Sequence, residues 1–172
     1  MSYEEHREAA RLTPVRCAVL TVSDTRDEDS DRSGSLIRVR LERTGHQVAF
    51  YRIIPDDAAV IRKAIQGLAG RVEVVLINGG TGFGARDRTV DVAEVLFEQR
   101  MPGFGELFRM LSFQEIGAGA MLSRATAGLY KGTLYFCLPG STQGVQLGLD
   151  KLILPELRHL VWEVIRQQAP ST

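Results

Sequence analysis

Cysteine is scarce in this chain: of 172 residues only Cys17 and Cys137 are cysteines, and each lies inside an apolar run. A disulfide framework or a thiolate metal site needs more cysteines at shorter spacing, so we expect two buried, reduced thiols. Long apolar runs are also missing, since no stretch approaches the roughly 18 residues of a membrane-spanning helix. Residues 1–14 carry acids and lack the apolar centre of a signal peptide. The sequence therefore predicts a cytoplasmic protein with no membrane partner.

An excess of charge of either sign is absent as well. Lys and Arg together number 21, and so do Asp and Glu, so the formal net charge is zero. A protein that binds duplex nucleic acid through a basic face carries surplus positive charge, so we expect no nucleic-acid partner, although a local basic patch stays open. The histidines His6, His46 and His159 have no metal-ligand spacing, and we assign them no catalytic role.

What the chain does contain is a set of strand patterns that alternate with helix patterns. The β-branched, apolar stretches predict strands over 15–23, 46–54 and 72–78. The amphipathic stretches predict helices over 35–45, 58–70 and 89–100. Alternation with short loops is typical of βαβ units, so we expect an α/β fold of three layers, α/β/α, with a mostly parallel sheet.

The remaining segments are predicted from more local signals. Residues 101–125 contain helical stretches, and two β segments flank Lys131-Gly132 as a small hairpin. The chain closes as a helix that we expect to break near Pro155. Residues 1–14 are either a short helix or a frayed tail, and 15–168 are expected to form a single domain.

Loops that follow parallel strands meet at one edge of the sheet, where open α/β sheets bind their ligands. The loop after the third strand carries Gly79, Gly80 and Gly82. Glycine lets backbone N–H groups approach a ligand, and successive inward N–H groups suit a phosphate; a tight strand-to-helix turn explains the same glycines. The loop lacks the Gly-Lys-Ser/Thr ending of a Walker A motif, and its loose dinucleotide pattern follows the wrong strand, which argues against a nicotinamide dehydrogenase.

Two acids stand in the loops at this edge, and each has two interpretations. Asp56, or its neighbour Asp57, could cap the helix over 58–70, and Asp87 the helix that begins near Thr89. Alternatively, Asp56 and Asp87 could hold Mg²⁺ beside phosphates bound by the glycines. The segment LPGST (138–142) is a candidate anion- or pterin-binding loop or an ordinary turn and cap. Ser123 and Arg124 offer a hydroxyl and a cation, or they belong to a solvated helix face.

Six motifs, in order, carry a family resemblance: TVSDTR followed by DRSG, IIPDD, INGGTGFGARDRT, MPGFGELFRMLSFQEIG, LSRATAG and LPGS. They span about residues 15–145 and resemble the MoaB/MogA family of molybdenum cofactor biosynthesis, on the MoaB side. The resemblance implies an α/β protein that forms a homotrimer or homohexamer. It also implies an adenylyltransferase that transfers AMP from Mg-ATP to molybdopterin and releases pyrophosphate.

The resemblance also implies site residues. Asp56 and Asp87 match the family's functional acids, which we expect to bind Mg²⁺, and Ser123 matches its functional serine. Substrate and nucleotide binding is expected from residues in the other motifs: Ser23, Asp24, Ser33, Gly79, Gly80, Thr81, Gly82, Pro139, Gly140 and Ser141.

Two positions depart from the family pattern. Val90 stands where proline is usual after RDRT, which alters the start of the helix only. Gln143 stands in the segment where many active members have a proline or a lysine, and loss of a phosphate-binding lysine would weaken molybdopterin binding. The alternative hypothesis is a molybdopterin-binding or scaffold protein without transfer activity; the retained Asp56 and Asp87 favour the enzyme.

Overall fold

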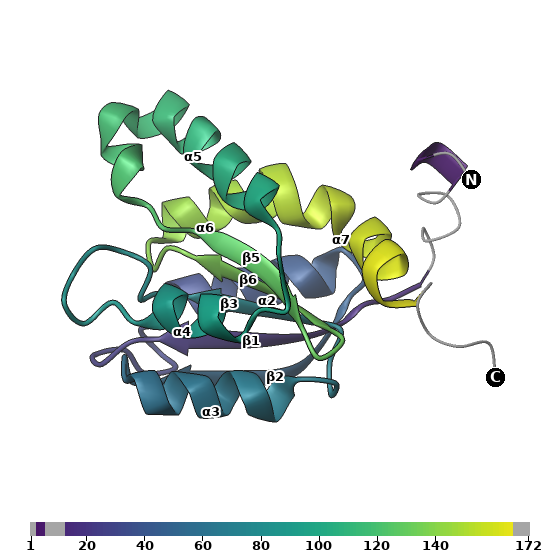
Figure 1. The fold of residues 1–172 in the computed structure, drawn as a ribbon, viewed down its shortest axis with the longest axis horizontal. Coiled ribbons are helices and arrows are strands. Elements are labelled where there is room, and N and C mark those ends of the chain that lie inside the picture. The colour runs from purple at the N-terminus through teal and green to yellow at the C-terminus, as the bar shows by residue number, and fades with distance from the viewer. Residues whose placement is uncertain (1–2, 6–12, 167–172) are drawn as a thin grey trace.

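A six-stranded mixed sheet organises the computed structural model, which describes residues 3–5 and 13–166 (Figure 1). The strand order is β2-β1-β3-β6-β5-β4. The strands are β1 (Arg16–Val22), β2 (Gln47–Ile54), β3 (Val74–Asn78), β4 (Gln99–Arg100), β5 (Thr126–Tyr130) and β6 (Thr133–Leu138).

Four strands, β2, β1, β3 and β6, run parallel, while β5 is antiparallel to both of its neighbours. Every residue of β3 and β6 is buried, as expected for central strands covered on both faces. The predicted hairpin is confirmed: Lys131 (φ 44°) and Gly132 (φ 73°) both adopt the left-handed conformation that a two-residue turn requires.

Helices cover both faces of the sheet, which confirms the three-layer α/β/α prediction (Figure 1). One apolar core lies under α2 (Arg32–Arg43), α5 (Pro102–Ile116), α6 (Thr142–Gly148) and α7 (Leu154–Val161). The other lies under α3 (Ala58–Leu68) and α4 (Thr89–Leu96). Short 3-10 or π segments, η1 (Gly117–Leu122), η2 (Leu149–Ile153) and η3 (Trp162–Arg166), complete the chain. No helix in the described ranges is long and apolar enough to cross a membrane.

The predicted helix over 89–100 is too long. It ends at Leu96, and the following residue, Phe97, is already extended, with φ −60° and ψ 123°. Residues 99–100 then form β4 and pair antiparallel with β5. Gly128 of β5 makes room for the Phe97 ring, because a Cβ there would overlap it. A tertiary contact therefore stops a helix whose apolar spacing continues in the sequence.

The predicted break near Pro155 is wrong as well. The N–H of Leu154 donates to the carbonyl of Leu149, five residues back, so a π turn widens the helix directly before the proline. Pro155, which has no N–H to donate, then occupies the first turn of α7. At the N-terminus residues 3–5 are helical, whereas 1–2, 6–12 and 167–172 lie outside the described residues.

The two cysteines are free and buried, as predicted. Burial raises the pKa of Cys17 and of Cys137 to about 12, and nearby carboxylates add to the effect. A thiol with such a pKa stays protonated and unreactive at neutral pH. Both side chains therefore serve packing.

One buried histidine makes stability depend on pH. His46 is 7% exposed, and its Nδ1 accepts the N–H of Val15 at 3.2 Å. Burial, together with the charge of Arg158, lowers its pKa to about 4 from 6.5. The unfolded chain therefore takes up a proton near pH 6.5 that the folded chain refuses until about pH 4. The neutral ring thus contributes stability above pH 6.5 that is lost as the pH falls.

We expect the free energy of unfolding to fall by about 3 kcal/mol between pH 6.5 and pH 4 because of His46 alone. The measurement is urea denaturation across this range, compared with His46→Asn, whose amide oxygen can accept the Val15 N–H but does not titrate. The stability of the wild type should fall relative to that of the variant as the pH is lowered from 6.5 to 4. Curves that stay parallel would contradict the assignment.

Candidate functional site

The loops that follow β1, β2, β3 and β6 line one cavity of about 650 Å³ at the carboxyl edge of the sheet. Eleven of the predicted site residues line it: Ser23, Asp56, Gly79, Gly80, Thr81, Gly82, Asp87, Ser123, Pro139, Gly140 and Ser141. Asp24 and Ser33 do not. The topology therefore brings together acids, glycines and hydroxyls from distant parts of the chain.

A buried carboxylate supports the walls of this cavity. Asp31 is 1% exposed and accepts the hydroxyl protons of Thr21 at 2.6 Å and of Tyr51 at 2.7 Å. It also accepts the N–H of Gly34 at 2.9 Å, which caps α2. The helix therefore begins at Arg32 rather than at the predicted residue 35, and one side chain joins β1, β2 and α2.

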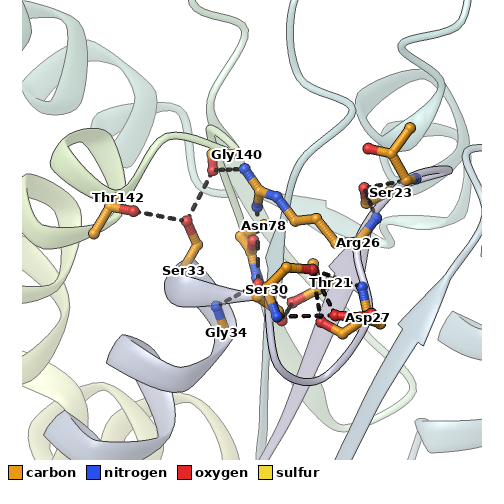
Figure 2. A network of polar contacts seen from close by, with 12 residues as sticks. Thr21, Ser23, Arg26, Asp27, Ser30, Ser33, Gly34, Asn78, Gly140 and Thr142 are labelled. Carbon is orange, nitrogen blue, oxygen red and sulfur yellow. Dashed lines mark hydrogen bonds and ion pairs between the residues drawn. The ribbon is translucent and has the colours of Figure 1, made fainter.

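Two side chains fix the turn after β6 by donating to one carbonyl oxygen (Figure 2). Arg26 donates to the carbonyl of Gly140 at 3.0 Å, and Ser33 donates to the same oxygen at 2.8 Å. Ser33 thus supports the cavity wall without facing the cavity. Ser141 caps α6 through the N–H of Gly144 at 3.1 Å, so the turn-and-cap interpretation applies to it, although it also lines the cavity.

The glycine loop makes a sharp turn directly after β3. Gly79 has φ 96° and Gly80 has φ 68°, a region that other residues avoid. A side chain at Gly79 would overlap the carbonyl of Val22, and one at Gly80 would overlap the hydroxyl of Thr89. Thr89 fixes the turn, since its hydroxyl donates to Gly79 at 2.8 Å and its N–H to Gly80 at 3.0 Å.

Neither predicted acid caps a helix through its carboxylate. Asp57, not Asp56, caps α3 by accepting the N–H groups of Ala59 and Val60, each at 3.0 Å. The residue that caps α4 is Arg88, and it does so without a side-chain hydrogen bond. Asp87 instead accepts the N–H of Gly84 at 2.7 Å, within its own loop. Both carboxylates line the cavity.

The electrostatics at this end of the cavity favour a cation. Burial raises the pKa of the Asp56 carboxyl, the N–H of Arg88 opposes it, and the carboxylates of Asp87 and Asp24 raise it further. Arg86 offsets part of this negative charge by pairing with Asp24 at 2.7 Å. In the described part of the chain no group of three or more His, Cys, Asp and Glu side chains could hold a metal alone. Two carboxylates completed by ligand phosphates and water suit Mg²⁺.

Several cavity residues escaped the sequence analysis. Thr25 and Arg26 belong to the loop after β1, whereas Ser112 and Glu115 come from α5. The α5 pair lies within the MPGFGELFRMLSFQEIG motif, but ordinary helical spacing does not single out these two side chains from their neighbours. Ser123 lines the cavity, and its hydroxyl accepts the N–H of Ala125 at 3.4 Å.

Comparison with known proteins gives consistent results. Residues 18–159 match a family model described as a probable molybdopterin binding domain. "Molybdenum cofactor biosynthesis protein B" of Halalkalibacterium halodurans is 47% identical over 171 residues, covering 98% of this chain and 100% of the relative. A crystal structure of a molybdenum cofactor biosynthesis protein B superposes with a TM-score of 0.87 at 45% identity, over 91% of this chain and 98% of that one. The tungsten cofactor synthesizing protein MoaB from Pyrococcus furiosus gives 0.77 at 34%, over 88% and 98%.

Removal of the Asp31 carboxylate should destabilise the fold strongly. Asp31→Ala leaves two hydroxyl groups and the first turn of α2 without their acceptor, so we expect a loss of about 3 kcal/mol in the free energy of unfolding. Urea denaturation measures it. Asp57→Ala is the matched control: it removes an exposed helix cap only and should cost about 1 kcal/mol. Equal losses would show that Asp31 is merely a cap.

Proposed function

The chain belongs to the MoaB/MogA family of molybdenum cofactor biosynthesis proteins, and from this premise we propose that it adenylylates molybdopterin with Mg-ATP. The observation that carries the proposal is that Asp56 and Asp87 line the same cavity as the glycine loop. Adenylyl transfer joins two anionic reactants, so it needs positioned donors and a site for a cation. The N–H groups of the glycine loop and the two carboxylates support these two roles.

In the proposed reaction a terminal phosphate oxygen of molybdopterin attacks the α-phosphorus of ATP. The bond from that phosphorus to the oxygen bridging to the β-phosphate breaks, and pyrophosphate leaves with the electron pair. The loop at Gly80–Gly82 would donate N–H groups to phosphate oxygens, and Ser123 and the Pro139–Ser141 turn would hold the second reactant. Neither aspartate acts as a nucleophile, because the attacking oxygen belongs to the substrate.

Asp56 and Asp87 would hold the magnesium ion, which when bound neutralises charge on the reacting phosphates. The residues fit this group: both carboxylates line the cavity, and neither caps a helix through its side chain. Burial is the main cause of the raised pKa of Asp56, and the Asp87 carboxylate adds to it; a divalent cation between the two would favour both charged carboxylates.

Two departures from the family pattern bear on the proposal. Val90 is buried in the first turn of α4, which begins at Thr89 without a proline. Gln143 lines the cavity and offers an amide instead of a cation. The alternative function is therefore a molybdopterin-binding scaffold without transfer activity, and the assay below distinguishes it from the enzyme.

The cytoplasmic location stays a prediction.

We further propose that the chain forms a homo-oligomer through an apolar surface on α5 and η1, which we call the α5 surface. It consists of exposed large apolar side chains: Leu107, Met110, Phe113, Ile116, Met121 and Leu122. Phe104 and Phe108 of the same helix are buried in the core, whereas Phe113 is 60% exposed. Contiguous apolar surface of this kind is typical of protein interfaces. Ile116 and Leu122 also line the cavity, so a partner would adjoin the site.

The Asp87→Asn variant tests the enzyme. We expect pyrophosphate release from molybdopterin and Mg-ATP to fall at least about 100-fold, because one ligand charge at the reacting phosphates is lost while the amide oxygen can still accept the Gly84 N–H. Asp150→Asn, which breaks a distant ion pair with Arg40, is the control and should retain full activity. Wild-type protein that binds molybdopterin but releases no pyrophosphate would establish the scaffold alternative.

The Phe113→Glu variant tests the oligomer. We expect the wild-type protein to sediment as a trimer or a hexamer, and the variant to shift to smaller species because a charge enters the α5 surface. Val95→Glu, at a position 72% exposed on α4, should leave the mass unchanged. A monomeric wild type, or a variant of unchanged mass, would rule out this surface.

A further inference from the structure

The glycine loop has an uneven distribution of hydrogen bonds. Several of its carbonyl oxygens accept hydrogen bonds: Thr89 bonds to those of Gly79 and Gly80, and other groups bond to those of Thr81, Gly82, Gly84 and Asp87. Its amides are divided, because those of Gly79, Gly84 and Asp87 donate to other groups in the described part of the chain and those between Gly79 and Phe83 do not. Within the described ranges, the N–H groups of Gly80, Thr81 and Gly82 donate to no other residue. The segment Gly80–Gly82, which lines the cavity, therefore keeps its backbone N–H groups free, whereas its carbonyl oxygens already accept hydrogen bonds from Thr89 and Arg124.

One residue, 42 positions away in sequence from Gly82, occupies three of these carbonyls. The backbone N–H of Arg124 donates to Thr81 at 3.2 Å, its Nε donates to Gly82 at 2.9 Å, and its Nη2 donates to Asp87 at 3.0 Å. The guanidinium thus joins both ends of the Gly82–Asp87 segment. Its planar fork can do so because the donor directions are fixed, which a lysine ammonium cannot reproduce.

The Arg124 side chain is itself held in place. Its Nη1 pairs with Asp91 of α4 at 2.8 Å, and its guanidinium lies 5.3 Å from the centre of the Phe83 ring. The side chain is 22% exposed and does not line the cavity. It therefore contacts the loop from outside the cavity and does not reach a ligand.

We propose that Arg124 is a positioning residue: it orients the glycine loop so that backbone N–H groups face an anion in the cavity, and it fixes Asp87 beside Asp56. The inference rests on the proposed function. By binding the loop carbonyls on the outer side, Arg124 keeps acceptor oxygens away from an anion in the cavity and leaves the amides of Gly80–Gly82 to it. By binding the Asp87 carbonyl, it sets the position of that residue's carboxylate.

The probe is magnesium pyrophosphate, titrated calorimetrically into the full chain without molybdopterin, so that binding is measured apart from transfer. We expect Arg124→Lys and Arg124→Gln to weaken binding at least tenfold. The lysine variant decides the cause, because it retains the positive charge and loses the fork. Arg166→Lys is the matched control: it disrupts a comparable guanidinium contact, with Glu73 at 2.7 Å, outside the cavity and should leave the affinity unchanged.

Wild-type affinity in Arg124→Lys, or no measurable binding by the wild type, would overturn the inference. Asp91→Asn serves as a second, milder variant, because Asp91 is 52% exposed and pairs only with Nη1 of Arg124. It should weaken binding about threefold, and unchanged affinity there would also count against the role. A wild type that binds magnesium pyrophosphate but does not transfer AMP would contradict the proposed function and leave the role of Arg124 in anion binding intact.

Discussion

The buried carboxylate of Asp31 is the interaction on which the site depends. It receives the hydroxyls of Thr21 on β1 and Tyr51 on β2 and lies 3.8 Å from the guanidinium of Arg26, which donates to Gly140. A buried charge is tolerable where several donors satisfy it, and breaking such a network leaves unpaired groups that cost free energy. The cavity walls at the ends of β1, β2 and β6 therefore share one electrostatic support.

The sheet could be predicted from the sequence because its information is local. A strand buried on both faces needs a run of apolar residues, and β1, β3 and β6 contain such runs. The errors arose where a distant contact decides the structure. Phe97 leaves the helix to pack on β5, and the π turn before Pro155 keeps a helix continuous that the proline alone would break. Periodicity along the chain does not record either effect.

The site divides in the same way. The glycine loop and the two acids were identifiable because parallel strands deliver their loops to one edge, whichever ligand is bound. The sequence could not show whether Asp56 or Asp57 caps the helix, because both are aspartates at adjacent positions and only the geometry separates them. Arg124 was equally ambiguous. Its partners are backbone carbonyls, which every residue has, so no side-chain pattern marks a residue that binds them.

The contacts that shape the cavity are separated widely along the chain, and this has a consequence for when the site can exist. Arg26 and Gly140 are 114 positions apart, and Ser33 reaches the same carbonyl across 107. A ribosome releases the chain from its N-terminus, so the loops that carry Asp56 and Asp87 emerge before the Gly140 turn that completes the cavity wall. The nascent protein therefore has its carboxylates long before it has a binding site. The cavity can close only after residues 139–141, in the final third of the chain, have been made.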